Sequence, residues 1–220
     1  MARIFAIGDI HGCSQSFKKL LLEELQICKS DKIYCVGDYI DRGPDSKGVI
    51  DFIINLRANG YNIHTLRGNH EQMMMDSEKS EETFEHWYFN GGNTTLKSFG
   101  INIYSEMPKI YRSFFSNTKL FITSGQYIFV HAGLNFSNED IFKDKKAMLW
   151  VRNFNSNQSV LGRRLLIHGH TPAALENILI QNGNCINIDG GCVYSEKIHL
   201  GRLVAFNVKD GKFISVSNCE

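Results

Sequence analysis

Five short segments of the chain place aspartate, asparagine or histidine among small residues directly after an apolar run. They are GDIHG (8–12), GDYIDRG (37–43), GNHE (68–71), VHAGL (130–134) and HGHTP (168–172). A lone histidine beside a strand is ordinarily a hydrogen-bonded structural residue, but five such segments, four of them with histidine, argue for one shared site. Carboxylate oxygens, amide oxygens and neutral imidazole nitrogens are ligands of paired divalent cations. The five segments therefore predict a dinuclear metal site.

The residue types distribute these ligands over two ions. Asp9 and His11 are separated by one residue in a tight turn, so both can point at one ion. Asp38 follows the next apolar run and can bridge the two ions. The second ion then takes one amide oxygen and two imidazole nitrogens, from Asn69, His131 and His170. This mixed set without cysteine favours manganese, iron or zinc over a structural zinc.

The segment VGDYIDRGPDS (36–46) has a simpler interpretation as well. Glycine, aspartate, proline and serine are ordinary turn residues, so a solvated turn alone would explain it. The recurrence of ligand-like residues at four other strand ends favours a metal and phosphate site instead. Within the segment, Asp45 is expected to be only a turn or helix-start residue, because GPDS leads into a helix.

The elements that must position these residues alternate in the first 70 residues. Apolar runs at 3–7, 32–36 and 61–68 predict buried strands. A helical face over 14–27, with Ser14 as its cap, and another from Ser46 to Gly60, with Ser46 as its cap, lie between them. The pattern predicts parallel strands with helical crossovers, whose carboxyl ends form the site.

The rest of the chain changes character. Residues 77–117 predict helices and loops over the mouth of the sheet, and 110–122 is expected to be helical. The segment FNGGNTTL (89–96) is either a substrate-facing loop or a plain turn. Short strands follow, and Asp210-Gly211 predicts a hairpin. We expect an α/β fold, two mixed β-sheets packed as a sandwich flanked by α-helices, in a single domain over 1–220.

Composition limits the classes of function. The net charge of +1 and the lack of basic and aromatic stripes argue against a nucleic-acid partner. No apolar run approaches the ~18–20 residues of a membrane span, and the opening MARIFAIGDIHG does not read as a secretory signal. Six cysteines without CxxC spacing indicate free thiols in a reducing compartment. We expect a cytoplasmic protein without membrane association, acting as a monomer.

Together the five segments resemble the calcineurin-like metallophosphoesterases, and within them the phosphoprotein (serine/threonine) phosphatase family, especially its small bacterial and phage members. The resemblance spans residues 4–193. It implies two divalent ions per chain, with manganese expected and iron or zinc as alternatives. It assigns the same six ligands: Asp9 and His11 to the first ion, Asp38 as the bridge, and Asn69, His131 and His170 to the second.

The resemblance also implies the catalytic roles. His70 would protonate the leaving alkoxide and Asp41 would orient His70. Arg42 and Arg152 are similar to the phosphate clamps of the family, and Asn69 and His70 would also contact the phosphate. A metal-bridging hydroxide would attack phosphorus directly, without a phosphoenzyme. The implied activity is hydrolysis of phosphoserine and phosphothreonine in proteins, with phosphotyrosine as a further substrate.

Three other functions compete with this one. Relatives that hydrolyse diadenosine tetraphosphate share the metal motifs and the GDIHGC opening, but tend to carry alanine where this chain has Asp41. A non-catalytic scaffold would be expected to have lost ligands, and all six are present together with His70 and Arg42. A nuclease or phosphodiesterase is disfavoured by the near-neutral charge.

Overall fold

The strands form two mixed sheets in the computed structural model, which describes residues 2–152, 156–181 and 183–220. The first sheet has the order β3-β2-β1-β8-β9, and the second has the order β4-β5-β6-β7. The strands of the first sheet are β1 (Ile4–Ile7), β2 (Lys32–Cys35), β3 (Asn62–Thr65), β8 (Arg202–Asn207) and β9 (Lys212–Ser217). Those of the second are β4 (Phe121–Ser124), β5 (Tyr127–Val130), β6 (Leu165–His168) and β7 (Cys185–Asn187).

Parallel pairing brings the carboxyl ends of the ligand-bearing strands to one edge. The pairs β1–β2 and β2–β3 are parallel in the first sheet, and β5–β6 and β6–β7 are parallel in the second. The pairs β1–β8, β8–β9 and β4–β5 are antiparallel, which makes both sheets mixed. The expected fold of two mixed sheets with flanking helices is confirmed.

Alternation along β1 shows how the core is divided. Ile4 and Ala6 belong to an apolar cluster between the sheets, which Phe129 and Ile167 join from the second sheet. Phe5 and Ile7 face the helices on the other side of the first sheet. A third cluster fills the outer face of the second sheet under α7 and α8. The cluster between the sheets therefore holds them together, and the other two clusters attach the helices to the outer faces.

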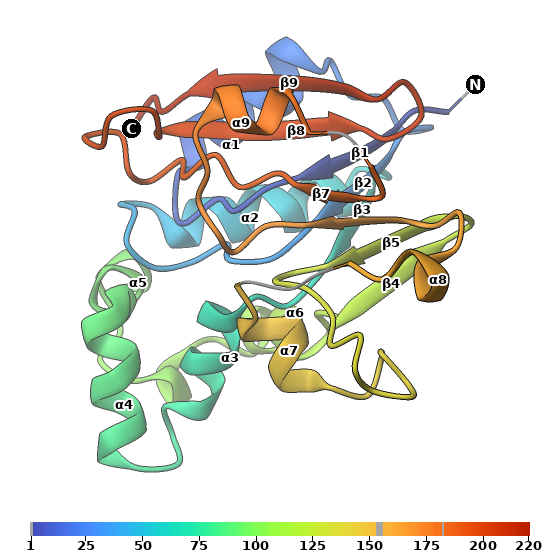
Figure 1. Ribbon diagram of the computed structural model, residues 1–220. Coiled ribbons are helices and arrows are strands. Elements are labelled where there is room, and N and C mark those ends of the chain that lie inside the picture. Colours follow the sequence, from blue (N-terminus) through green and yellow to red (C-terminus); the bar gives the residue numbers. More distant parts are fainter. Residues whose placement is uncertain (1, 153–155, 182) are drawn as a thin grey trace.

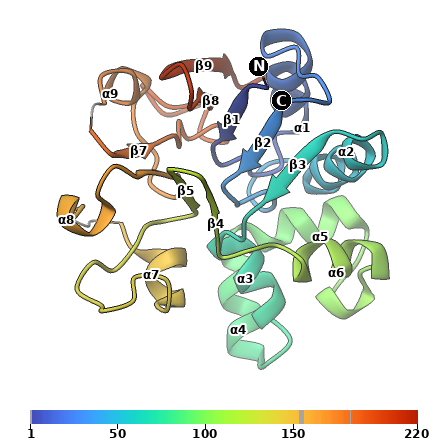
Figure 2. The ribbon, with the colours of Figure 1, turned by 90° about the vertical axis from the view of Figure 1, so that its right-hand side faces the viewer.

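The helices are distributed over both sides of this sandwich (Figures 1 and 2). The helices α1 (Ser14–Lys19) and α2 (Ser46–Ala58) cover the first sheet, and α7 (Lys145–Trp150) and α8 (Gln158–Leu161) cover the second. The short α9 (Leu175–Leu179) precedes β7. A group that we call the helical cap lies to one side, green in Figure 2: α3 (Asn69–Asp76), α4 (Glu81–Trp87), α5 (Asn93–Phe99) and α6 (Lys109–Ser116), with short turns at Tyr88–Gly92 (η2) and Tyr104–Glu106 (η3).

Two predicted helix caps are wrong. Ser14 lies inside α1 and its hydroxyl donates to Asp45 Oδ2 at 2.7 Å, while Cys13 precedes the helix. The helix α2 is capped by Asp45, whose Oδ1 accepts from the N–H of Gly48 at 2.8 Å, and Ser46 is its first residue. The segment predicted as one helix at 14–27 ends in a π-helical turn, η1 (Leu20–Glu24). Aspartate in the cap position satisfies an N–H that would otherwise have no partner.

Of the other predictions made from the sequence, some are confirmed by the structure and some are wrong. The segment 110–122 is helical only to Ser116, and β4 begins at Phe121. Residues 89–96 are not a loop: they form the end of the π-helical turn η2, which is kinked at Gly91, and the start of α5. The hairpin between β8 and β9 turns at Asp210-Gly211 as predicted. All six cysteines are free. No helix within the described ranges is long and apolar enough to cross a membrane.

Candidate metal and phosphate site

The five sequence segments meet at the carboxyl ends of the strands, and backbone hydrogen bonds join them. The N–H groups of Ile10 and His11 both donate to the carbonyl of Asp38, at 3.0 and 2.8 Å. The N–H of Gly169 donates to the carbonyl of His131 at 2.8 Å, which links the ends of β5 and β6. The N–H of His170 also donates to Asp9 Oδ2 at 3.0 Å, so the structure brings together residues 161 positions apart.

The backbone of the site is held in an uncommon conformation. Only seven described residues other than glycine have a positive φ, and five of them are predicted site residues: His11, Asp38, Asp41, Arg42 and His170. Such values lie in a sparsely populated region and persist only when the surrounding structure enforces them. This concentration marks the site independently of the residue types.

Three lone-pair atoms crowd the predicted second metal position. His131 Nε2 lies 2.9 Å from Asn69 Oδ1 and 3.1 Å from His170 Nδ1, and His170 Nδ1 lies 2.8 Å from Asn69 Oδ1. His131 Nδ1 lies 3.1 Å from the carbonyl of Val36, where it donates, so Nε2 carries the lone pair. Burial lowers the pKa of His131, and burial together with His131 lowers the pKa of His170 to about 3. Neutral imidazoles and an amide oxygen so arranged suit a cation between them.

A shared carboxylate connects this group to the predicted first metal position. Asp38 Oδ2 lies 3.5 Å from His131 Nε2 and 3.5 Å from His11 Nε2. His11 Nδ1 is 2.9 Å from the carbonyl of Ile40, to which it donates, so Nε2 again carries the lone pair. The ligand atoms of Asp38, His131 and His170 all lie within 4.8 Å of one another. Asp38 is therefore placed as a bridge.

The surroundings of the Asp9 carboxylate favour a bound cation. Its Oδ1 is buried without a hydrogen-bond partner, although its Oδ2 accepts from the N–H of His170 at 3.0 Å. Burial, followed by repulsion from Asp189 and Asp38, raises the pKa of Asp9 well above its usual range. A buried carboxylate oxygen without a donor is costly unless a positive charge faces it. The six predicted ligands therefore fit two divalent ions.

His70 differs from the other site histidines because it is tied to a carboxylate. Its Nδ1 lies 2.7 Å from Asp41 Oδ2, and both side chains are buried. Trp87 Nε1 donates to Asp41 Oδ2 at 3.0 Å and the Thr95 hydroxyl donates to Oδ1 at 2.6 Å. Burial alone would lower the pKa of His70, but the charges of Asp38 and Asp41 raise it. The imidazole is thus oriented by Asp41, and the two carboxylates favour its protonated form.

Both predicted phosphate clamps border the ligands. Arg42 Nη1 donates to His11 Nε2 at 2.7 Å, and its guanidinium carbon lies 5.6 Å from the ring centre of Tyr194. Arg152 is exposed and its Nη1 donates to the carbonyl of His170 at 3.1 Å. The two guanidinium groups thus flank the ligand cluster, one beside each predicted ion.

Three residues that contact the site were not singled out from the sequence. Glu71 is buried, and its carboxylate accepts from the N–H groups of Asp38, Tyr39 and Gly68 at 2.8–2.9 Å. Trp87 and Thr95 reach Asp41 from the helical cap across 46 and 54 positions. A glutamate three positions after a helix start was the available signal for Glu71. No local pattern signals the other two.

A comparison with protein families matches residues 2–202 to the calcineurin-like phosphoesterases. Serine/threonine-protein phosphatase 1 of Salmonella typhimurium is 29% identical over 206 residues, which cover 91% of both chains. An asymmetrical bis(5'-nucleosyl)-tetraphosphatase of Anoxybacillus flavithermus is 26% identical, over 96% of this chain and 92% of its own.

A solved structure shares the fold. A protein serine/threonine phosphatase from Saccharomyces cerevisiae superimposes with a TM-score of 0.66 at 17% identity, covering 100% of this chain and 81% of its own. The family match, which covers most of the chain, agrees with the sandwich of mixed sheets and with the ligand cluster at the strand ends. The chain therefore belongs to the calcineurin-like phosphoesterase family.

Proposed function

We propose that the protein hydrolyses phosphoserine and phosphothreonine in proteins, with phosphotyrosine as a further substrate. Asp9, His11, Asp38, Asn69, His131 and His170 would hold two divalent ions, with manganese proposed for both. When bound, the ions would withdraw charge from the phosphate and activate water as the nucleophile. Phosphoproteins are the proposed partners of a cytoplasmic monomer.

The observation that carries this proposal is the pair His70 and Asp41. An alkoxide of serine or threonine is a strong base and leaves only if it receives a proton, so its release needs a general acid. His70 lies beside the ligand Asn69, and its Nδ1 is 2.7 Å from Asp41 Oδ2. The raised pKa of His70 keeps this proton available. Its Nε2 is the atom that would protonate the leaving oxygen.

Arg42 and Arg152 would hold the phosphate. Both guanidinium groups already donate to atoms of the ligand histidines, His11 Nε2 and the carbonyl of His170. Forked N–H donors match the oxygens of a phosphate and offset the charge that develops on them in the transition state. A site that binds its substrate mainly through the phosphate would also hydrolyse small aryl phosphates.

A second candidate is hydrolysis of dinucleoside polyphosphates. It is favoured by the tetraphosphatase of Anoxybacillus flavithermus, which matches this chain over a slightly larger share than the Salmonella phosphatase does. The chemistry of the leaving group separates the two candidates. A nucleotide leaves as a weakly basic phosphate and needs little protonation, whereas a protein alkoxide depends on His70 and Asp41.

The test is a side-by-side measurement of kcat/KM, with manganese supplied, on a phosphothreonine peptide and on diadenosine tetraphosphate. We expect the peptide to be the better substrate and His70→Asn to lower its kcat by about 10²–10⁴-fold. His86→Asn, at an exposed histidine of α4, is the matched control and should keep full activity. Faster cleavage of the dinucleotide, or activity that survives His70→Asn, would overturn the proposal.

A further inference from the structure

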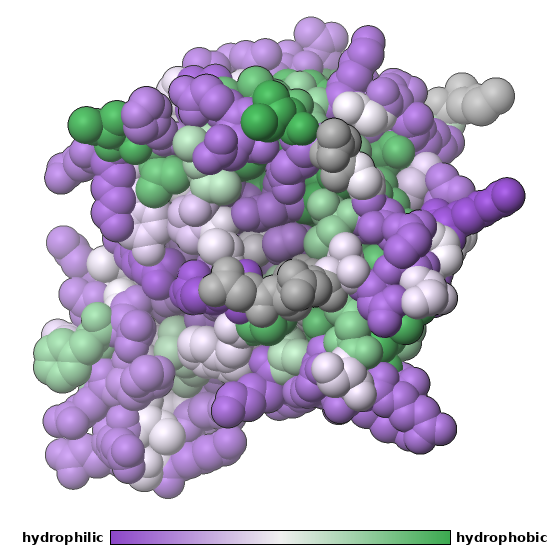
Figure 3. All heavy atoms as spheres, in the orientation of Figure 1, coloured by the Kyte–Doolittle hydropathy of each residue, from purple (hydrophilic) through white to green (hydrophobic). Residues whose placement is uncertain are grey.

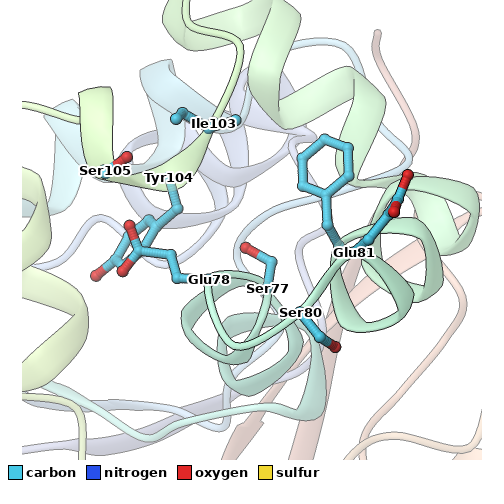
Figure 4. Close-up of a pocket in the computed structure, with 8 residues that line it drawn as sticks. Ser77, Glu78, Ser80, Glu81, Ile103, Tyr104 and Ser105 are labelled. Carbon is cyan, nitrogen blue, oxygen red and sulfur yellow. The ribbon is translucent and has the colours of Figure 1, made fainter.

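A cavity of about 310 Å³ opens in the helical cap, between the α3–α4 connection and η3 (Figure 4). Phe84, Ile103 and Tyr104 supply apolar walls, and Glu78 and Glu81 supply carboxylates. Ile103 is 46% exposed, so its side chain is accessible to a ligand in the cavity. The cavity thus combines apolar walls with negative charge at its edge.

The negative charge at the cavity comes from one segment of the chain. Residues 76–85, DSEKSEETFE, hold five acidic side chains and one lysine in a chain whose net charge is +1. That lysine, Lys79, pairs with Asp76 at 2.8 Å. Neither Glu78 nor Glu81 forms an ion pair with any residue in the described ranges. Glu78 lies beside Tyr104 in Figure 4, and its charge, after burial, raises the pKa of Tyr104, whereas the charges of Arg112 and Arg67 lower it.

This cavity is close to the catalytic histidine. Phe84 packs against Trp87 with ring centres 6.3 Å apart, Trp87 donates to Asp41, and Asp41 pairs with His70. The helix α3 begins with Asn69 and His70 and ends at Asp76, just before the cavity. Its eight residues span about 12 Å, at ~1.5 Å each. An extended peptide covers that distance in about four residues, at ~3.3 Å each.

We propose that the cavity docks a lysine or arginine side chain of the phosphoprotein substrate, about four or more residues from the phosphorylated serine or threonine. This inference rests on the proposed phosphatase activity. The aliphatic stem of the basic side chain packs against Phe84 and Ile103, and its charged end meets Glu78 and Glu81. The substrate is then held at two points, by its phosphate and by its basic residue.

The test compares two phosphothreonine peptides, one with two arginines four to seven residues from the phosphothreonine and one with glutamines in their place. We expect KM to be about three- to tenfold lower for the arginine peptide, with equal kcat. The double variant Glu78→Gln/Glu81→Gln should remove this difference. The control Glu82→Gln/Glu85→Gln changes two exposed acidic residues of α4 that do not line the cavity. It should keep most of the difference in KM between the two peptides.

Three results would overturn the inference: equal KM for the two peptides, loss of the difference equally in both double variants, or an equal gain when the arginines directly adjoin the phosphothreonine. An aryl phosphate, which has no basic residue, separates this failure from failure of the phosphatase proposal. Its hydrolysis should be unchanged in both double variants. Absence of peptide and aryl phosphate hydrolysis in the unmodified protein would instead overturn the phosphatase activity itself.

Discussion

At the scale of single residues, the candidate site is a set of side chains whose charge states are fixed by their neighbours. Burial lowers the pKa of His131 and His170, which keeps their nitrogens available to a metal, whereas nearby carboxylates raise the pKa of His70. The same residue type would therefore serve as ligand or as acid according to its surroundings. The charge of Asp38 raises the pKa of His70, and Asp41 adds to it through a hydrogen bond of 2.7 Å to His70 Nδ1 and its own charge.

Replacing Asp41 by asparagine tests that role. We expect Asp41→Asn to lower kcat for a phosphothreonine peptide by about 10²-fold, because His70 loses its carboxylate partner and one of the two charges that favour its protonated form. The loss should be smaller for an aryl phosphate, whose leaving group needs less protonation. Asp45→Asn is the control, since asparagine also caps a helix, and it should retain activity. Equal losses on the two substrates would contradict the proton-donor role of the pair.

At the scale of elements, the sequence predicted the strands well and the helical cap poorly. Short apolar runs that end in glycine and ligand-like residues locate β1, β2 and β3 to within a few residues, because burial on both faces leaves a continuous apolar signal. The same signal located the six proposed ligands. The contacts of Trp87 and Thr95 with Asp41 arise only when the helical cap folds back on the site. Periodicity in one segment carries no information about such a contact.

At the turn η2, the helical cap packs directly against the candidate site. Gly91 has φ of 110°, its carbonyl accepts from the N–H of Arg42 at 3.2 Å, and a Cβ there would lie 2.8 Å from Arg42 Cγ. The helical cap therefore contacts Arg42, a proposed phosphate clamp, directly. Only glycine allows both the positive φ and this close approach.

The corresponding prediction is that Gly91→Ala displaces Arg42. We expect kcat/KM for the phosphothreonine peptide to fall by about tenfold or more, because small displacements of a group that positions the substrate are costly. Gly100→Ala is the matched control: φ is 67° and nothing lies within 4 Å of its added Cβ. It should lower the melting temperature through backbone strain alone and leave kcat/KM unchanged. An equal loss of activity in both variants would contradict the role of η2.

At the scale of the whole molecule, the proposed ligands come from both sheets. Asp9 and Asp38 follow β1 and β2 of the first sheet, while His131 and His170 follow β5 and β6 of the second. Five carboxylates are buried in or beside the site, those of Asp9, Asp38, Asp41, Glu71 and Asp189. Burial and mutual repulsion raise the pKa of Asp189 to about 7 and that of Glu71 to about 8. Cations bound at this site would offset the repulsion among the buried carboxylates and link the two sheets.

Metal binding should therefore stabilise the entire fold. At a metal concentration about 100 times Kd, binding to the native state alone contributes about 2.7 kcal/mol, which corresponds to a rise in melting temperature of roughly 5–10 °C for a chain of this size. We expect that difference between protein with manganese and protein with a chelator, followed by calorimetry. His170→Ala, which removes a ligand from the second sheet, should lose much of the difference, whereas His199→Gln, at an exposed histidine, should keep it. A melting temperature that does not respond to metal, or a full response in His170→Ala, would show that the two sheets are held together by their apolar core alone.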